Sequence, residues 1–161
     1  MFESFNVPCL YTSVQAVLAL YSSGRTSGIV IDSGEETTHF VPIYEGYQVI
    51  PAINKLSLGG AHLNAYMIKL LGEKGINMTS STEYEIVREI KEKMCYVAGD
   101  YEAAMRECAD NHSIEKTYDL PNGQKITLSN ERFMCPEALF NPSTIGLEFD
   151  GIHKLALLSV M

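Results

Sequence analysis

The feature that most constrains this chain is a short apolar strand running into a glycine-containing turn. Residues 28–34 read GIVIDSG, and residues 37–43 (TTHFVPI) follow as the returning strand of a hairpin. The near-continuous apolar run from Gly28 to Ile31 is typical of a strand buried on both faces of a sheet. A single hairpin supplies too few neighbours for that burial. We therefore expect further chain to cover this strand.

Helical spacing of apolar residues predicts helices on both sides of this hairpin. Three apolar stripes, given at the end of this paragraph, each predict a helix. The third of these helices opens with a capping box at residues 82–85. On its outer face, i, i+4 pairs join Arg88 to Glu92 and Glu89 to Lys93. A fourth, shorter helix is expected at residues 101–108. The apolar stripes are Val14, Val17, Leu18 and Tyr21, ending at Gly24; Leu63, Met67, Leu70 and Leu71, ending near Gly72 or Gly75; and Ile86, Ile90, Met94 and Val97.

The sequence of the C-terminal third predicts a second hairpin and a final helix without a C-cap. Residues 116–120 and 124–128 flank a PNG turn, which is a strong hairpin signal. The apolar segment from Ile152 to Val160 runs to Met161 without a C-cap residue. We interpret this end, together with the uncovered first strand, as a sign that the chain is the central piece of a longer protein.

Composition and charge exclude several classes of function. The chain has 161 residues, 46% of them hydrophobic, and a formal charge of −8. Nucleic acids and anionic lipids require basic patches, so we expect neither as the main partner. No apolar run approaches the roughly 20 residues that span a bilayer. The N-terminus lacks a basic segment typical of a secretory signal, and we expect a cytosolic protein without membrane insertion.

The cysteines and histidines show no metal-site spacing. The four cysteines (Cys9, Cys95, Cys108 and Cys135) stand far apart, and none forms a Cys-x-x-Cys pair. A zinc site and a disulfide framework are both disfavoured by this pattern. Cysteine is often buried as a small hydrophobic residue, and this is the reading we expect for each of the four.

Longer motifs make the chain resemble actin. Residues 23–26 (SGRT), 28–34 (GIVIDSG) and 39–47 (HFVPIYEGY) carry the likeness. It continues through 85–98 (EIVREIKEKMCYVA), 120–124 (LPNGQ), 130–140 (NERFMCPEALF) and 151–153 (GIH). The resemblance covers essentially the whole chain, although family members are more than twice as long.

The resemblance implies the α/β ATPase fold shared by actin, sugar kinases (hexokinase) and the large heat-shock chaperones. Two domains of that fold close over a nucleotide, each with a phosphate-binding hairpin. The chain then comprises the end of the small outer domain (1–22), the phosphate-loop sheet of the large domain (23–58 and 148–161) and its helical distal subdomain (59–147). The first phosphate loop and a later glycine pair behind the adenine lie outside it.

The resemblance also implies a site for ATP or ADP with Mg²⁺ or Ca²⁺. The turn formed by Asp32, Ser33, Gly34, Glu35 and Glu36 matches the second phosphate loop. A turn of this kind can form a nest, which is a concave site where successive backbone N–H groups converge on an anion. The Asp32 carboxylate repels phosphate and is expected to bind the metal ion through water.

Further residues match the hydrolytic and base-binding parts of the family site. The counterparts of Gln15 and His39 position the attacking water. An amide is a poor base, so hydrolysis is expected to be slow. Lys91 and Glu92 match residues beside the adenine, Arg88 and Glu92 match residues near the ribose, and Gly60 matches a backbone contact. Without the resemblance, these residues read as ordinary surface and strand positions.

Two loops match contact surfaces between family subunits. Residues 144–147 (TIGL) correspond to a mobile loop that packs against neighbouring subunits, and the alternative is a loop folded onto its own domain. Residues 44–47 match a loop that contacts the next subunit and several regulators. The expected partners are therefore further copies in a filament and actin-binding proteins, at the cytoplasmic cytoskeleton.

Departures from the family pattern leave two functions open. Glu36 replaces a usual glycine, Glu35 a usual aspartate, and Ala61 with His62 a usual Arg-Asp pair; Pro51 stands one position late. Gln15, Asp32 and His39 favour a polymerising actin that hydrolyses ATP. Glu36 favours a non-polymerising actin-related subunit of a larger complex. A sugar kinase is disfavoured, because nothing in the sequence indicates a sugar site.

Overall fold

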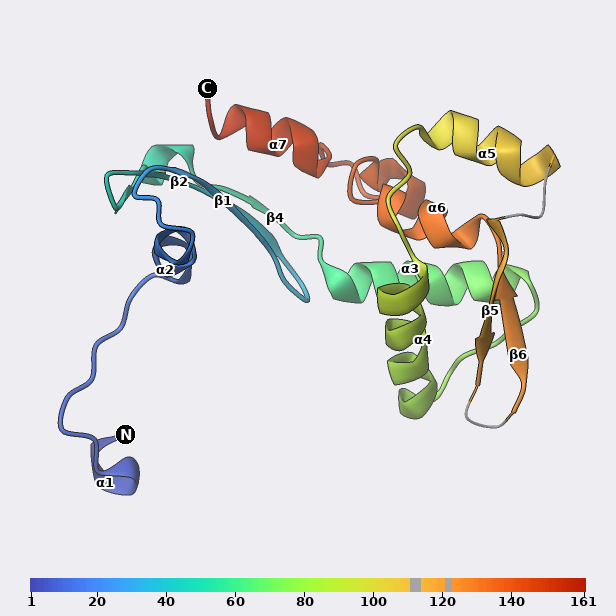
Figure 1. Cartoon of the computed structure of the whole chain (residues 1–161), viewed down its shortest axis with the longest axis horizontal. Coiled ribbons are helices and arrows are strands. Elements are labelled where there is room, and N and C mark those ends of the chain that lie inside the picture. The colour runs from blue at the N-terminus through green and yellow to red at the C-terminus, as the bar shows by residue number, and fades with distance from the viewer. Residues whose placement is uncertain (111–113, 121–122) are drawn as a thin grey trace. The chain divides into compact units, whose positions relative to one another are not determined.

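The computed structural model describes residues 1–110, 114–120 and 123–161 and has a mixed α/β fold (Figure 1). The chain forms two compact units. The first unit comprises residues 1–32, 39–55 and 155–161, and the second comprises residues 33–38 and 56–154. Each unit has its own cluster of buried apolar side chains, so the two are described separately.

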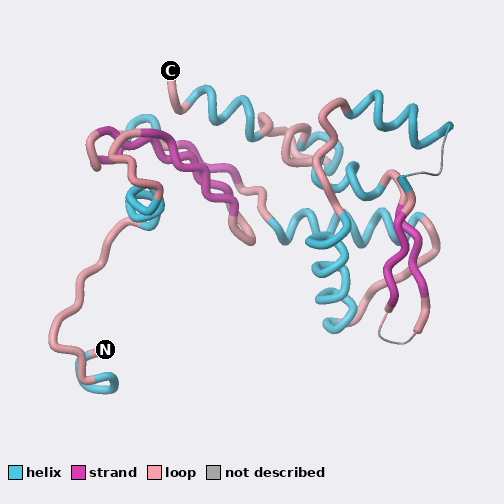
Figure 2. The backbone as a smooth tube through the Cα atoms, viewed as in Figure 1, coloured by secondary structure: helices cyan, strands magenta, loops and turns pink. Residues whose placement is uncertain are grey.

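The first unit is built on a small sheet, drawn in magenta in Figure 2. Its strands are β1 (Gly28–Ser33), β2 (Thr38–Tyr44), β3 (Tyr47–Gln48) and β4 (Asn54–Leu56). Their order is β1-β2-β3, and β4 also pairs with β2. The β2–β3 pair is antiparallel, with Ile43 opposite Gln48. The predicted hairpin at residues 28–43 is therefore present, and β2 is its central strand.

The expected burial of β1 on both faces is not found. Ile31 is 49% exposed, and no residue of β1 is fully buried. The physical reason is position: β1 is an edge strand with β2 as its neighbour, whereas β2 buries Phe40, Val41 and Ile43. The apolar pattern identified the strand correctly, and its burial by further chain stays a prediction.

The first predicted helix is present as α2 (Gln15–Ser22), but a different face is buried. Ala16 and Leu20, four residues apart, pack with Val41 and Ile43 of β2. Leu18 and Tyr21 of the predicted stripe are about half exposed. Of the predicted stripe, Val17 packs partly against this cluster, so the buried face is rotated toward Ala16 and Leu20. The remaining elements of this unit are α1 (Phe2–Phe5), η1 (Ile50–Ala52) and the end of α7 (Ile152–Leu158).

The second unit is mainly helical. Helices α3 (Gly60–Glu73), α4 (Ser81–Met94) and α6 (Glu131–Glu137) share one apolar core. The predicted stripe of α3 is confirmed, because all four of its members are buried. Burial of such side chains is the main force that stabilises a domain. The core residues are Leu63, Met67, Leu70, Leu71, Met78, Val87, Ile90, Ile126, Leu128, Cys135 and Ala138.

Helix α4 begins earlier than its predicted capping box. Ser80 is the N-cap, and its Oγ accepts from the Glu83 N–H at 3.2 Å. The Glu83 carboxylate in turn accepts from the N–H groups of Ser80 and Thr79 at 2.7 and 2.8 Å. The box at residues 82–85 was therefore wrong by two positions, since Ser80 and Glu83 satisfy the same pattern. Both predicted i, i+4 ion pairs of α4 are confirmed.

The second hairpin and the fourth helix are also present. Strands β5 (Lys116–Asp119) and β6 (Lys125–Leu128) pair antiparallel, with Thr117 opposite Thr127. Helix α5 covers Tyr101–Asp110. Residues 121 and 122 of the predicted PNG turn lie outside the described residues. Figure 1 shows the hairpin beside α3 and α6, and Ile126 and Leu128 join the core of these helices.

Two expectations about single residues need correction. Cys9 is exposed, because it lies in a segment outside helices and strands in which residues 8–14 are all exposed, whereas Cys135 is buried as expected. The loop after α6 forms η3 (Pro142–Ile145) and does not present an exposed apolar tip. Ile145 packs against the core of the second unit, and Leu147 is half-buried. The loop is folded onto its own unit, which was the alternative reading.

Candidate functional site

The turn between β1 and β2 is held by short hydrogen bonds within the second unit. The Gly34 N–H donates to the Thr37 carbonyl at 2.9 Å, which closes the turn. The hydroxyls of Ser33 and Thr38 lie 2.9 Å apart, and the Thr38 hydroxyl donates to the Leu58 carbonyl at 2.7 Å. Thr38 is fully buried, so the base of the turn is fixed.

The same turn caps the N-terminus of α3. The N–H groups of Gly60 and Ala61 donate to the carbonyls of Gly34 and Glu35 at 2.9 and 2.7 Å. A Cβ atom at Gly59 would lie 2.5 Å from the Gly34 oxygen and 2.6 Å from the Glu35 oxygen. Only glycine permits this approach of two backbones. The turn and α3 therefore hold each other in place.

His62 contributes to the same cap. Its Nδ1 accepts a hydrogen bond from the Gly59 N–H at 3.3 Å, from the third position of the helix. A side-chain acceptor at this position commonly satisfies the N-cap amide, as in a capping box. His62 thus supplies part of the helix cap.

The tip of the turn presents unused backbone donors. Within the described residues, neither the Glu35 N–H nor the Glu36 N–H donates a hydrogen bond. Both side chains are exposed. Adjacent free N–H groups at a glycine-containing turn form a concave donor surface suited to an anion. The exposed Glu36 carboxylate has room to extend into solvent.

Helix α4 brings charged side chains to this region. The Lys91 Nζ donates to the Gly60 carbonyl at 3.2 Å. A Cβ atom at Gly60 would lie 3.3 Å from the Lys91 Nζ and 3.4 Å from a Glu35 carboxylate oxygen. The structure therefore brings together three residues of the predicted site: Glu35, Gly60 and Lys91.

Arg88 and Glu92 form a charged pair one turn away on the same helix. The Arg88 Nε donates to Glu92 at 3.1 Å, and its Nη1 lies 3.5 Å from a Glu85 oxygen. The hydrogen bond to Glu92 and the charges of Glu92, Glu85 and Glu35 raise the pKa of Arg88. All of these groups are exposed, so the pair contributes little to stability. It can still orient a polar ligand.

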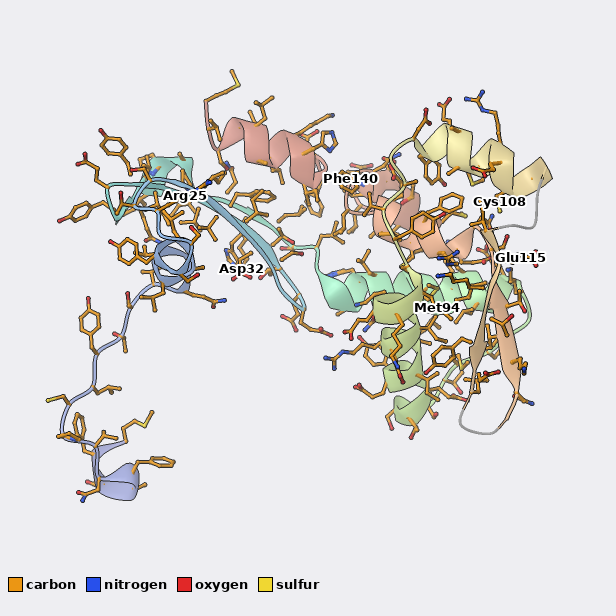
Figure 3. All side chains as sticks on the ribbon, viewed as in Figure 1. Arg25, Asp32, Met94, Cys108, Glu115 and Phe140 are labelled. Carbon is orange, nitrogen blue, oxygen red and sulfur yellow. The ribbon has the colours of Figure 1, made fainter. Side chains whose placement is uncertain are left out.

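In the first unit, the two residues Gln15 and Asp32 meet. The Gln15 Nε2 donates to an Asp32 carboxylate oxygen at 3.0 Å. Gln15 is the first residue of α2, and Asp32 lies near the end of β1, where Figure 3 labels it. His39 is half-buried on the neighbouring strand β2. Two of the predicted catalytic and metal-binding residues are thus directly linked.

Comparison with known protein families decides the assignment. A family model described as Actin matches residues 1–161, which is the entire chain. The chain belongs to the actin family. Its mixed α/β structure fits the actin-type fold, so the resemblance and the fold class are confirmed.

Actin-family membership carries general properties. Members of the family bind a nucleotide and a divalent cation, self-associate, and are typically cytoskeletal. Among the described residues, no helix has the length and apolar character to cross a membrane. The described residues also contain no group of three or more His, Cys, Asp or Glu side chains arranged as metal ligands.

The sequence reading missed two parts of this site. Gly59 was not singled out there, and His62 appeared only as a departure. The signal for Gly59 was the double glycine at the start of an apolar helical stripe, because glycine at a helix N-terminus often marks close backbone approach. The contact between Gln15 and Asp32 had no sequence signal, since the residues lie on separate elements.

Proposed function

We propose that this chain is part of an actin-like cytoskeletal subunit that binds ATP or ADP with Mg²⁺ or Ca²⁺. In the full-length protein it hydrolyses ATP slowly and assembles into filaments in the cytoplasm. The observation that carries this proposal is the pair of free N–H groups at Glu35 and Glu36, on a turn fixed by hydrogen bonds. Ser33 and Gly34 complete the proposed phosphate loop.

The residues present fit a nucleotide. The turn offers donors to phosphate oxygens, and its base is rigid. Asp32 fits a role as acceptor for water molecules on a divalent cation, because the hydrogen bond from Gln15 orients its carboxylate. A bound cation would supply charge neutralisation for the phosphates.

Gln15 fits the positioning of a water molecule. Its Nε2 is engaged with Asp32, which fixes the amide and leaves Oε1 as the acceptor for a water proton. An amide cannot take up that proton as a base, so its contribution is orientation alone. We assign His39 a role with the same water. We expect slow hydrolysis, because the amide of Gln15 holds the water without acting as a base.

Helix α4 supports recognition of the nucleoside. Lys91 is anchored on the Gly60 carbonyl, so its stem and charge are held beside the start of α3. Arg88 and Glu92 present a donor and an acceptor that are already paired. We propose that Lys91 and Glu92 flank the adenine, Arg88 and Glu92 the ribose, and that Gly60 allows the backbone to approach the nucleotide.

The β2–β3 turn supports association with further subunits or regulators. Tyr44 is 65% and Tyr47 is 80% exposed. The turn is rigid, because the Glu45 N–H donates to the Ser27 hydroxyl at 2.9 Å and the Gly46 N–H to the Thr26 carbonyl at 2.8 Å. Two exposed tyrosines on a fixed turn are suited to protein contacts.

The alternative function is a non-polymerising actin-related subunit of a larger complex. It depends on the Glu36 carboxylate facing the phosphates. At about 5 Å and an effective dielectric near 20, that repulsion is roughly 3 kcal/mol. This is about a hundredfold in affinity. The exposure of Glu36 favours the outward orientation, and hence the ATP-binding function.

Calorimetric titration of ATP into full-length Glu36→Gly and Glu36→Gln proteins tests this choice. With the side chain outward, we expect Glu36→Gly to improve affinity less than tenfold. Glu36→Gln is the matched control, because it removes the charge and leaves the backbone restricted. A gain of a hundredfold or more in both variants would show that the carboxylate faces the phosphates, and would favour the non-hydrolysing subunit.

A further inference from the structure

The C-terminal end of α4 is clamped to α6 around Cys95. Cys95 is the C-cap residue of α4, and both of its neighbours are bound to Arg132 of α6. The Arg132 Nε donates to the Met94 carbonyl at 2.9 Å, and the Tyr96 N–H donates to the Arg132 carbonyl at 3.0 Å. Figure 3 labels Met94 at this end of α4. The backbone at Cys95 is therefore held against α6.

A second cysteine lies on the facing helix. Cys135 follows Arg132 by three residues, so the two share one side of α6. Cys135 is fully buried, and its thiol donates to the Leu63 carbonyl at 3.4 Å. Cys95 packs against the same core cluster, of which Cys135 is a member. The pKa of each thiol also responds to the presence of the other. Two free thiols are thus neighbours.

The two thiols differ in acidity. The hydrogen bond with Cys135 lowers the pKa of Cys95, and the positive charges of Arg132 and Lys91 lower it further against the effect of burial. The hydrogen bond with Cys95 and burial raise the pKa of Cys135. Thiolate is the reactive form of cysteine. Cys95 is also half-buried and Cys135 fully buried, so a small oxidant meets Cys95 first.

We propose that Cys95 and Cys135 are a redox-active dithiol that closes to an intramolecular disulfide when a peroxide oxidises Cys95. The Cys95 thiolate attacks one peroxide oxygen, the O–O bond breaks, and hydroxide leaves. Cys95 becomes a sulfenic acid. The Cys135 sulfur then attacks the Cys95 sulfur, the S–O bond breaks, and the departing hydroxide takes the Cys135 proton as water. In total, two thiols are oxidised and hydrogen peroxide is reduced to two waters.

The other two cysteines provide internal controls. Cys9 is exposed in the segment before α2, and Cys108 lies 3.0 Å from the Ser129 hydroxyl. Within the described residues, neither has a recorded contact with another thiol. A disulfide confined to the two core cysteines would therefore reflect their contact and not general oxidation.

Peptide mapping of the peroxide-treated chain tests the proposal. After oxidation the chain is unfolded, free thiols are alkylated, and the digest is analysed without reduction. We expect one linked peptide pair containing Cys95 and Cys135, which dithiothreitol separates. Cys108→Ser should leave its yield unchanged. In Cys135→Ser, whose hydroxyl can still donate to Leu63, Cys95 should accumulate as a sulfenic acid that dimedone traps.

Two results would overturn the proposal. One is a wild-type chain in which Cys95 and Cys135 both remain alkylatable at peroxide concentrations that oxidise Cys9. The other is a dimedone adduct on Cys95 that reaches the same level in wild type and in Cys135→Ser. Should Cys135→Ser fail to fold by circular dichroism, Cys95→Ser replaces it. Cys135 must then stay reduced, because its oxidation without Cys95 would refute the assigned order.

Discussion

Gly59 is the residue through which the phosphate-loop turn and α3 depend on each other, and Gly59→Ala tests that dependence. Its φ of −160° is extended backbone that any residue adopts, so the substitution brings no backbone strain of its own. The effect is steric, because the new Cβ would lie 2.5 and 2.6 Å from two backbone oxygens. Backbone atoms cannot rotate away as a side chain can, so the turn must move off the helix.

The size of the effect follows from what that movement disrupts. Relieving an overpacked contact costs about 1–3 kcal/mol. The two hydrogen bonds from Gly60 and Ala61 to the turn lengthen at the same time, and each contributes about 1 kcal/mol. These terms overlap, because lengthening the bonds is how the clash is relieved. We expect local opening of the α3 N-terminus to become easier by about 2–3 kcal/mol, which is roughly thirty- to hundredfold.

Amide hydrogen exchange followed by NMR measures this opening residue by residue. In Gly59→Ala, the Gly60 and Ala61 amides should exchange roughly thirty- to hundredfold faster than in wild type. Gly99→Ala is the matched control, because an added Cβ there meets nothing within 4 Å. It should leave both rates unchanged. Exchange at these two amides within about threefold of wild type in Gly59→Ala would refute the reasoning.

Two further predictions concern the helices that frame the site. Hydrogen bonds from the backbone N–H groups of Ser80 and Thr79 lower the pKa of Glu83 in the folded state. The contribution of Glu83 to stability is therefore complete above about pH 4.5, and it is lost as the pH falls through the lowered folded-state pKa. The melting-temperature advantage of wild type over Glu83→Gln should therefore disappear in acid, and a constant difference from pH 7 to about 2 would contradict this. Lys74→Met removes the ammonium group that lies 2.8 Å from the buried Glu131 carboxylate. The free energy of unfolding, measured in urea, should fall by about 3 kcal/mol. Lys69 is exposed, and Lys69→Met should change the free energy of unfolding by less than about 0.5 kcal/mol. Equal losses in the two variants would show that the Lys74–Glu131 ion pair is unimportant.

Local patterns predicted elements well wherever one segment carried the whole signal. Helix α3 is the best example, since its apolar stripe is entirely buried. The ion pairs of α4 followed directly from i, i+4 spacing. The capping box of α4 was misplaced, because Ser80 with Glu83 and Thr82 with Glu85 fit the same four-residue pattern. The hydrogen bonds to Ser80 and Thr79 decide between them.

The candidate site also combines residues that are close in the sequence with contacts that only the fold creates. Asp32, Gly34 and Glu36 were predicted as parts of a phosphate loop from a family resemblance; Gly34 and Glu36 lie in the turn after β1, Asp32 lies in β1, and their binding role stays a prediction. The hydrogen bond between Gln15 and Asp32 joins a helix to a strand, and no spacing rule connects those positions. The role of His62 was hidden as well, because its Nδ1 serves a cap whose geometry depends on where α3 begins.

By itself, the sequence determined the type of most elements, because apolar periodicity and turn residues act within a few positions of each other. The family and the fold class came from the motifs that the chain shares with actin. Only the tertiary structure decided which faces are buried and which distant groups meet. Packing on the sheet buries Ala16 and Leu20 of α2, whereas Leu18 and Tyr21 stay about half exposed. Packing of α4 on α6 placed Cys95 against the core cluster that contains Cys135. Such contacts depend on how separate surfaces fit together, and one-dimensional spacing does not encode that fit.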